Sequence, residues 1–269
     1  MNLAISNIGW KREDDAAVAA LMRDAGIAGV EVAPTAVWPE PLLATPEQLR
    51  SYRTRWSDQG IQIVALQALL YGHPELTLFG APERRAGMLR HLTGMMDVAA
   101  ALGAGPLVFG SPTNRAVGDL PPGTINQIAV DFFRAAGVRA AERGVTLCLE
   151  PNPPAYKCDF VTTVADGLAL VREVASAGFG LHVDAGALAL NEEPIASTIG
   201  GAAWAMRHFH ASEPFLAPLG SGTTNHEACA EALRASGYRG WVSLEMRQPP
   251  DGLEGVRRSL DLLRVRYGG

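Results

Sequence analysis

Cysteine and basic residues are scarce in this chain, and both shortages exclude classes of protein. Only three cysteines, Cys148, Cys158 and Cys229, occur among 269 residues. They are too few and too scattered for a disulfide framework or a thiolate zinc site. Lys and Arg number 23 against 28 Asp and Glu, with no basic run and a formal charge of −5. We therefore expect no nucleic-acid partner, because such a surface needs clustered cations to neutralise phosphates.

Long hydrophobic runs and linkers are also missing. No apolar run approaches the ~20 residues that span a bilayer, so we expect no membrane partner. The start, MNLAISNIGW, lacks a basic segment followed by a long apolar stretch, which predicts no signal peptide and a cytoplasmic location. No Gly/Ser-rich or Pro-rich linker divides the chain, so we predict one domain over residues 1–269.

Short apolar runs alternate with helical patterns along the whole chain. Strands are predicted at residues 3–8, 28–33, 61–67, 105–110, 145–150, 179–184, 204–210 and 240–246. Helices are predicted at residues 14–25, 46–59, 82–102, 124–143, 162–176, 194–200, 226–236 and 252–266. Strands this apolar are typical of a parallel sheet covered by helices on its outer face.

The lengths of the connections favour a barrel over an open sheet. The longest irregular segments all follow a strand, at 34–45, 71–81, 111–123, 151–161 and 211–225. The turns that follow helices are short. A (β/α)₈ barrel of about 250 residues has its functional loops on the strand-to-helix side. The segment after the first strand, NIGWKRED, is not the Gly-rich turn of a Rossmann fold. We predict an α/β fold, a single (β/α)₈ TIM barrel.

Four polar residues stand at the ends of the last four predicted strands. They are Glu150, Asp184, His210 and Glu245, separated by 34, 26 and 35 residues. Because such strand ends converge in a barrel, three carboxylates and one imidazole would bind a divalent cation. These donors are mostly hard oxygens, which suit Mn²⁺ or Mg²⁺, while Co²⁺ and Zn²⁺ also accept them.

Strand alternation adds two more histidines to this region. His182 precedes Asp184 by two residues, and His208 precedes His210 by two. Residues two apart in a strand share a face, so we place both histidines one layer below the strand ends. There we expect them to support the ligands or to pack in the core rather than to bind the cation.

At this point the sequence resembles a known family. The motifs LEPNP (149–153), HVD (182–184), HFHASE (208–213) and SLEM (243–246) are similar to those of xylose isomerase-like TIM barrels. They are most similar to the sugar isomerase/epimerase branch, which includes ketose 3-epimerases, hydroxypyruvate isomerase and inositol-catabolism proteins. The resemblance extends over nearly the whole length of the chain.

The resemblance implies roles for the four strand-end residues. It makes Glu150, Asp184, His210 and Glu245 the metal ligands of an isomerase or epimerase. It also makes Glu150 and Glu245 the acid/base pair on opposite faces of a carbohydrate-like substrate, which would react through an enediolate. A homo-oligomer is compatible with this assignment.

Two departures from the family pattern concern the substrate. Ketose epimerases typically have a His three residues after the metal-binding Asp, where this chain has Ala187. They also have an Arg soon after the metal-binding His, whereas segment 211–219 contains none. We therefore expect free ketohexoses to be poor substrates, and a bulkier, keto-modified or less hydroxylated substrate to be preferred.

Side chains near the strand ends are candidates for substrate contacts. We predict this role for Gln67, Ser111, Tyr156, His182, Arg247 and Trp38. The apolar segment FLAPL (215–219), with Trp38 and Tyr156, is predicted to line a pocket for a less polar or larger substrate, and packing within the loops is an equal alternative. For Arg247, a surface ion pair is an equal alternative. Glu31 is predicted to face the pocket or to pair with a basic side chain. Asn114 and Arg115, on a loop, are predicted to be within reach of substrate.

Three other functions remain open. A lyase of the same fold would dehydrate a keto-substrate or cleave a keto-glycoside, and the two departures favour it. An apurinic endonuclease would need further His and Asp/Glu ligands and basic DNA-gripping loops, which this acidic chain lacks. A non-catalytic binding barrel would not need the complete set of four ligand-type residues.

Overall fold

Eight parallel strands close into a barrel in which each strand pairs with its neighbours in sequence and β8 pairs with β1. The computed structural model describes residues 1–269. The strands are β1 (Asn2–Ser6), β2 (Gly29–Val32), β3 (Gln62–Leu66), β4 (Pro106–Phe109), β5 (Thr146–Leu149), β6 (Phe179–Asp184), β7 (Met206–Ser212) and β8 (Trp241–Glu245). The predicted (β/α)₈ TIM barrel is therefore confirmed.

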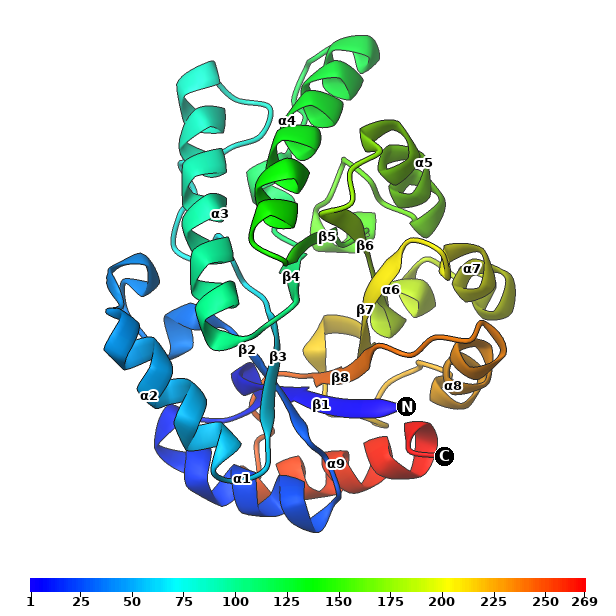
Figure 1. Cartoon of the computed structure of the whole chain (residues 1–269). Coiled ribbons are helices and arrows are strands. Elements are labelled where there is room, and N and C mark those ends of the chain that lie inside the picture. The colour runs from blue at the N-terminus through cyan, green and yellow to red at the C-terminus, as the bar shows by residue number, and fades with distance from the viewer.

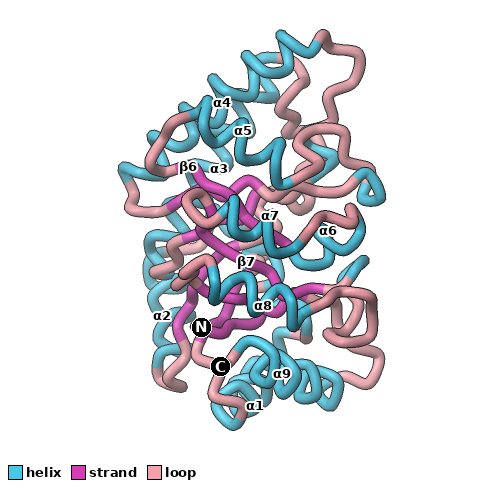
Figure 2. Tube along the Cα trace, turned by 90° about the vertical axis from the view of Figure 1, so that its right-hand side faces the viewer, coloured by secondary structure: helices cyan, strands magenta, loops and turns pink.

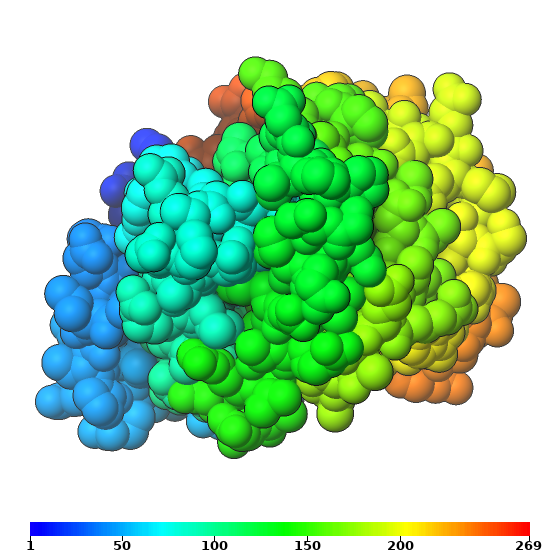
Figure 3. Space-filling view, turned by 90° about the horizontal axis from the view of Figure 1, so that it is seen from above, coloured from blue at the N-terminus to red at the C-terminus, as the bar shows by residue number.

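Helices surround this barrel in the order of the sequence (Figure 1). They are α1 (Asp15–Asp24), α2 (Pro46–Ser57), α3 (Pro82–Leu102), α4 (Pro122–Glu142), α5 (Val164–Val174), α6 (Ala185–Leu190), α7 (Ile195–Ala202), α8 (His226–Ala235) and α9 (Leu253–Tyr267). Seen from above, the cyan α3 lies beside the green α4 and covers one side of the molecule (Figure 3). None of these helices combines the length and apolar character needed to cross a membrane.

Local sequence explains where several helices begin and end. Thr45 caps α2 and forms a capping box with Gln48, whose side chain accepts from the backbone N–H of Thr45. The helix α3 ends at Gly103, with φ of +81°, a conformation that glycine adopts without steric cost. Such signals explain why the predicted helix boundaries lie close to the observed ones.

The strands lie within a surrounding layer of helices (Figure 2), and the apolar core lies mainly between the two. A single cluster of 70 buried apolar residues fills this layer. The inside of the barrel, by contrast, holds buried polar side chains, among them Glu31, His182 and His208. The outer layer therefore provides the hydrophobic stabilisation, and the interior can hold polar groups.

Two differences from the predicted elements affect the site. The helix α6 was not predicted, and it begins directly after Asp184. The strand β7 continues two residues beyond His210, to Ser212. Both differences add polar or backbone groups around Asp184.

Candidate active site

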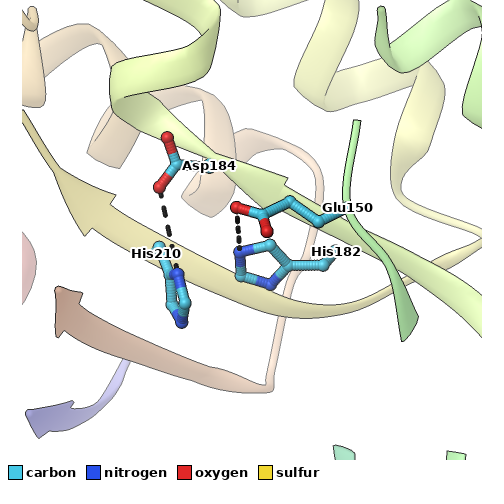
Figure 4. Close-up of side chains that lie close together, drawn as sticks. All are labelled: Glu150, His182, Asp184 and His210. Atoms are coloured by element: carbon cyan, nitrogen blue, oxygen red, sulfur yellow. Dashed lines mark ion pairs between the residues drawn. The ribbon is translucent and has the colours of Figure 1, made fainter. Parts of the chain in front are cut away.

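The four strand-end residues meet at the C-terminal mouth of the barrel. Asp184 and His210 are paired in register across β6 and β7. Nδ1 of His210 lies 3.2 Å from Oε2 of Glu245 and 3.9 Å from Oδ2 of Asp184. The potential ligand atoms of Glu150, His182, Asp184 and His210 all lie within 4.8 Å of one another. Figure 4 shows Asp184 beside His210 and Glu150 beside His182, with a dashed line joining each pair.

A pocket of about 450 Å³ opens above this cluster. Its walls come from the loops that follow β4, β5, β7 and β8. The lining residues are Gly110, Ser111, Pro112, Glu150, Asn152, Tyr156, Asp184, Phe215, Leu216, Glu245 and Arg247. A pocket of this volume with a few convergent polar groups is the usual form of a small-molecule site.

Asp184 is held by hydrogen bonds to both of its carboxylate oxygens. Oδ1 accepts from the backbone N–H of Ala187 at 2.6 Å, which makes Asp184 the N-cap of α6. Oδ2 accepts from Ser212 Oγ at 2.5 Å, and that hydroxyl accepts from the N–H of Gly186. The unpredicted helix α6 and the extended β7 thus fix the orientation of this carboxylate.

His210 is oriented by a buried carboxylate from the opposite side of the barrel. Glu31, in β2, accepts from Nε2 of His210 at 2.9 Å and from Nε2 of His208 at 3.1 Å. Glu31 and both histidines are buried. With the proton on Nε2, the Nδ1 lone pair of His210 faces the carboxylates of Asp184 and Glu245.

The two glutamates have separate supports. Oε1 of Glu245 accepts from the amide of Gln67 at 2.7 Å. The backbone carbonyl of Glu150 accepts from Arg115 at 2.7 Å and from the amide of Asn152 at 3.2 Å. Gly110 leaves room for the carboxylate of Glu150, because a Cβ at that position would lie 2.2 Å from Glu150 Oε2. Gln67 therefore orients the carboxylate of Glu245, whereas the hydrogen bonds at Glu150 fix its backbone.

The close carboxylates shift the pKa values of the site. Burial, and then the charges of Asp184 and Glu245, raise the pKa of Glu150 to about 8. Burial and the charge of Glu245 raise the pKa of Asp184 to about 6. Burial alone would lower the pKa of His210, but Glu31 and Glu245 raise it well above its ordinary value. Unpaired negative charge of this kind is relieved by a proton or by a cation.

The donor set fits a divalent cation. Nδ1 of His210 is buried and makes no hydrogen bond, although it faces two carboxylates. A nitrogen lone pair among carboxylate oxygens is a ligand arrangement that Mn²⁺, Mg²⁺, Co²⁺ and Zn²⁺ accept. The structure therefore contains a Glu/His/Asp cluster able to hold a metal.

His182 lies below the strand ends, as its spacing predicts. Its ring is fully buried, with Nε2 3.9 Å from Oε1 of Glu150, and neither ring nitrogen has a hydrogen-bond partner. Burial, and then the neighbouring His210 and His208, lower its pKa well below the ordinary value. His182 does not line the pocket, so direct substrate contact would need a rearrangement.

The other predicted substrate contacts fall into two groups. Ser111, Tyr156 and Arg247 line the pocket. Gln67 is buried beneath Glu245 and donates its amide to that carboxylate. Trp38 lies outside the pocket, packed edge-on against Tyr52 with ring centroids 5.2 Å apart, because the loop after β2 folds toward α2. Its predicted alternative of loop packing agrees with this position.

Three minor expectations are wrong. Glu31 pairs with histidines rather than with Arg or Lys, because no basic side chain enters the barrel beside it. Asn114 donates to the carbonyls of His73 and Leu76 and thereby fixes a loop. Arg115 is fully buried behind Glu150. Neither loop residue is free to reach substrate.

Sequence reasoning missed several residues that shape the site. Ser212, Asn152 and Gly110 touch or abut the candidate ligands. Asn152 lies in the LEPNP motif and Ser212 in the HFHASE motif, so proximity to a ligand was the available signal. Phe215 and Leu216 belong to the apolar segment 215–219, which was predicted to line a pocket or to pack the loops, and both line the pocket.

A family model and several known proteins are similar to this chain in sequence. Residues 19–266 match the family model described as xylose isomerase-like TIM barrel. The 3-dehydro-D-guloside 4-epimerase of Escherichia coli (strain K12) is 26% identical over 191 residues, covering 68% of this chain and 72% of the relative. The L-ribulose 3-epimerase of Mesorhizobium japonicum is 31% identical over 106 residues, 39% of this chain and 35% of the relative.

Solved structures share the fold over the full length. The apo 3-keto-D-glucoside 4-epimerase of E. coli superposes with a TM-score of 0.81 at 20% identity, covering 98% of this chain and 99% of that one. A D-psicose 3-epimerase solved in the presence of D-fructose gives a TM-score of 0.83 at 18% identity and full coverage of both chains. Relatives in sequence are thus sugar epimerases, and structural neighbours have the same barrel.

Proposed function

The chain belongs to the xylose isomerase-like TIM barrel family, and from this premise we propose that it is a divalent-metal-dependent sugar epimerase or isomerase. Its substrate is a ketose or a related α-hydroxy carbonyl compound. The observation that carries the proposal is the meeting of three carboxylates with His210, whose buried Nδ1 faces them and makes no hydrogen bond. The epimerase relatives support the choice of reaction class.

Glu150, Asp184, His210 and Glu245 would hold the cation, with Mn²⁺ or Mg²⁺ as the ions best matched to these donors. When bound, a divalent cation supplies Lewis-acid polarisation of a substrate carbonyl and its neighbouring hydroxyl. Asp184 and His210 have both of their polar atoms engaged or aimed at the site. We assign them to ligation alone.

Glu150 and Glu245 would also move protons. They enter the pocket from β5 and β8, which lie on different sides of the barrel. One carboxylate removes the proton from the carbon beside the carbonyl, and the other delivers a proton to the opposite face. Both carboxylates line the pocket, so each can reach a bound substrate. The amide of Gln67 keeps Glu245 in position.

Deuterium incorporation tests this proposal. The protein with Mn²⁺ is incubated in D₂O with a panel of free ketoses and 3-keto-glucosides, and products are followed by NMR and mass spectrometry. We expect one deuterium at the carbon whose configuration changes, without loss of water. Loss of water or cleavage of the glycosidic bond would instead identify the lyase. If no member of the panel exchanged a proton with the solvent, both the epimerase and the lyase would be excluded.

A further inference from the structure

We propose that the turn at Phe215–Leu216 forms a binding subsite for a second ring of the substrate. The preferred substrate is then a glycoside whose sugar carries the keto group, rather than a free ketose. This inference rests on the proposed function, and it adds a substrate class and the residues that select it.

The turn forms the lip of the pocket. Phe215 and Leu216 line the same 450 Å³ space as Glu150, Asp184 and Glu245. The side chain of Phe215 is nonetheless 54% exposed. A large apolar side chain left exposed at the mouth of a polar pocket is a contact surface for a ligand. The keto sugar would occupy the carboxylate end, and a second ring would lie against the lip.

Neighbouring loops hold this lip in a strained conformation. Phe215 and Leu216 have φ of +59° and +58°, a region that residues with side chains rarely adopt. The N–H of Phe215 donates to Tyr156 Oη at 2.9 Å, and its carbonyl accepts from Arg247 Nη2 at 2.5 Å. The carbonyl of Leu216 accepts from the backbone N–H of Arg247 at 2.9 Å. Strain that is maintained in this way is typical of ligand sites.

Tyr156 and Phe215 form an apolar corner at the lip, and this surface exists before any ligand binds. The rings of Tyr156 and Phe215 lie 5.4 Å apart at 76°, so they form two walls of different direction. Burial raises the pKa of Tyr156 to about 12, so its hydroxyl stays protonated and remains a polar group at the edge of the corner. A pyranose or aryl ring offers an apolar face to such a corner and polar atoms at its rim. Because the surface is fixed before binding, little ordering cost opposes the contact.

The rest of the pocket favours the same substrate class. A free ketose must place all its hydroxyls on polar partners, but Ala187 is a buried methyl group and segment 211–219 has no Arg. The volume of the pocket lies in the range that accommodates ligands larger than one sugar ring. A glycoside satisfies both conditions, because its second ring replaces polar contacts with apolar ones.

Two matched ligands test the subsite. The methyl and phenyl glycosides of 3-keto-glucose are titrated into the Mn²⁺-loaded protein by calorimetry, and their turnover is measured separately. We expect the phenyl glycoside to bind roughly tenfold more tightly than the methyl glycoside. Phe215→Ala should reduce that preference to about twofold or less, mainly by weakening the phenyl glycoside, and an unchanged circular dichroism spectrum shows that the variant is folded. Val265→Ala, at an apolar residue 69% exposed on α9, should keep the full preference.

Other results would overturn the subsite. Equal binding of the two glycosides by the unaltered protein, or an equal loss of both in Phe215→Ala, would show that the lip does not recognise a second ring. Light scattering that finds Phe215→Ala dissociated into smaller species, with the sugar preference intact, would make the lip a contact between copies of the chain. A lack of turnover of both glycosides, with the binding preference present, would count against the proposed function while still supporting the subsite.

Discussion

Glu31 is the single residue through which the barrel interior acts on the candidate metal centre. Its carboxylate accepts from Nε2 of both His208 and His210. Although burial opposes its ionisation, the two histidines hold its pKa well below the ordinary value. The ionised carboxylate therefore holds Nε2 of His210 and keeps Nδ1 toward the pocket, where a cation would replace its proton.

Replacing Glu31 should weaken metal binding without touching a ligand. We expect Glu31→Gln to lower Mn²⁺ affinity by about 10- to 100-fold, the usual effect of losing a partner of a ligating histidine. Calorimetric titration with Mn²⁺ measures it, and the exposed Glu13→Gln serves as the control. Unchanged affinity in Glu31→Gln would mean that strand geometry alone orients His210.

Substitutions of the two glutamates should have different effects from substitutions of Asp184 and His210. Glu150→Gln and Glu245→Gln keep an oxygen for the metal but cannot carry a proton, so kcat should fall by about 10²–10⁴-fold with partial metal occupancy retained. Asp184→Ala and His210→Ala should fail first in metal binding, and excess metal should restore part of their activity. Occupancy is measured by elemental analysis alongside kcat. Near-normal rates in both metal-loaded Gln variants would make the glutamates ligands only.

At the scale of elements, Glu213 secures the loop between β7 and α8 that includes the pocket lip. Its buried carboxylate accepts from the N–H of Gly220 at 2.9 Å and of Thr224 at 3.0 Å. It also accepts from Nε2 of His226 at 3.1 Å, and Tyr267 donates to the other nitrogen of that ring. One side chain therefore ties the loop to α8 and α9.

Removal of this carboxylate should loosen the loop. Glu213→Ala leaves several donors without a partner, at about 1–3 kcal/mol each, so the melting temperature should fall by several degrees. Hydrogen exchange should accelerate at residues 217–224 and remain unchanged in α3. Exposed Glu227→Ala provides a control on a neighbouring helix. Exchange that rises evenly over the barrel would show a general loss of stability instead.

Most elements were predictable because their signals are local. The eight strands and the long helices follow from apolar runs, glycines and capping residues such as Thr45. The helix α6 was missed because its six residues, AGALAL, follow β6 without a break and its cap is Asp184 itself, which was already interpreted as a ligand. A short helix whose cap is also a site residue has no separate signal in the sequence.

The positions of the four ligand-type residues were predictable, but those of their partners were not. Strand ends converge in any barrel, so the meeting of Glu150, Asp184, His210 and Glu245 followed from spacing. The partners of His210 and Glu245 did not, because Glu31 and Gln67 come from strands that do not adjoin β7 or β8. Trp38 was misplaced for a related reason, since the direction of a loop depends on packing against α2.

At the scale of the whole molecule, the excess of buried carboxylates makes stability depend on pH. In chelator-treated protein, Glu150 has a pKa of about 8 against 4.5 in an unfolded chain. Between these values the folded state binds the extra proton, so stability falls as pH rises. His210, whose pKa is raised well above 6.5, acts in the same direction. His182 stays neutral and adds nothing above its unfolded pKa.

We therefore expect the melting temperature of EDTA-treated protein to fall by several degrees from about pH 6.5 to about pH 8.5. Scanning calorimetry at constant ionic strength measures this. Glu150→Gln should flatten the slope, and saturating Mn²⁺ should abolish it, because the cation replaces the proton. A melting temperature that rises over this range would contradict the proton balance.

The contact of Glu31 with His208 and His210 also has a consequence for the order of folding events. It joins residues 177 and 179 positions apart in the sequence, so it forms only when the sheet has closed on itself. Contacts of such long range tend to form late, and His210 is not oriented for a metal before then. Mn²⁺ should therefore slow unfolding in stopped-flow experiments while leaving the refolding rate nearly unchanged. The metal would therefore stabilise the closed barrel against unfolding without taking part in the nucleus of its folding.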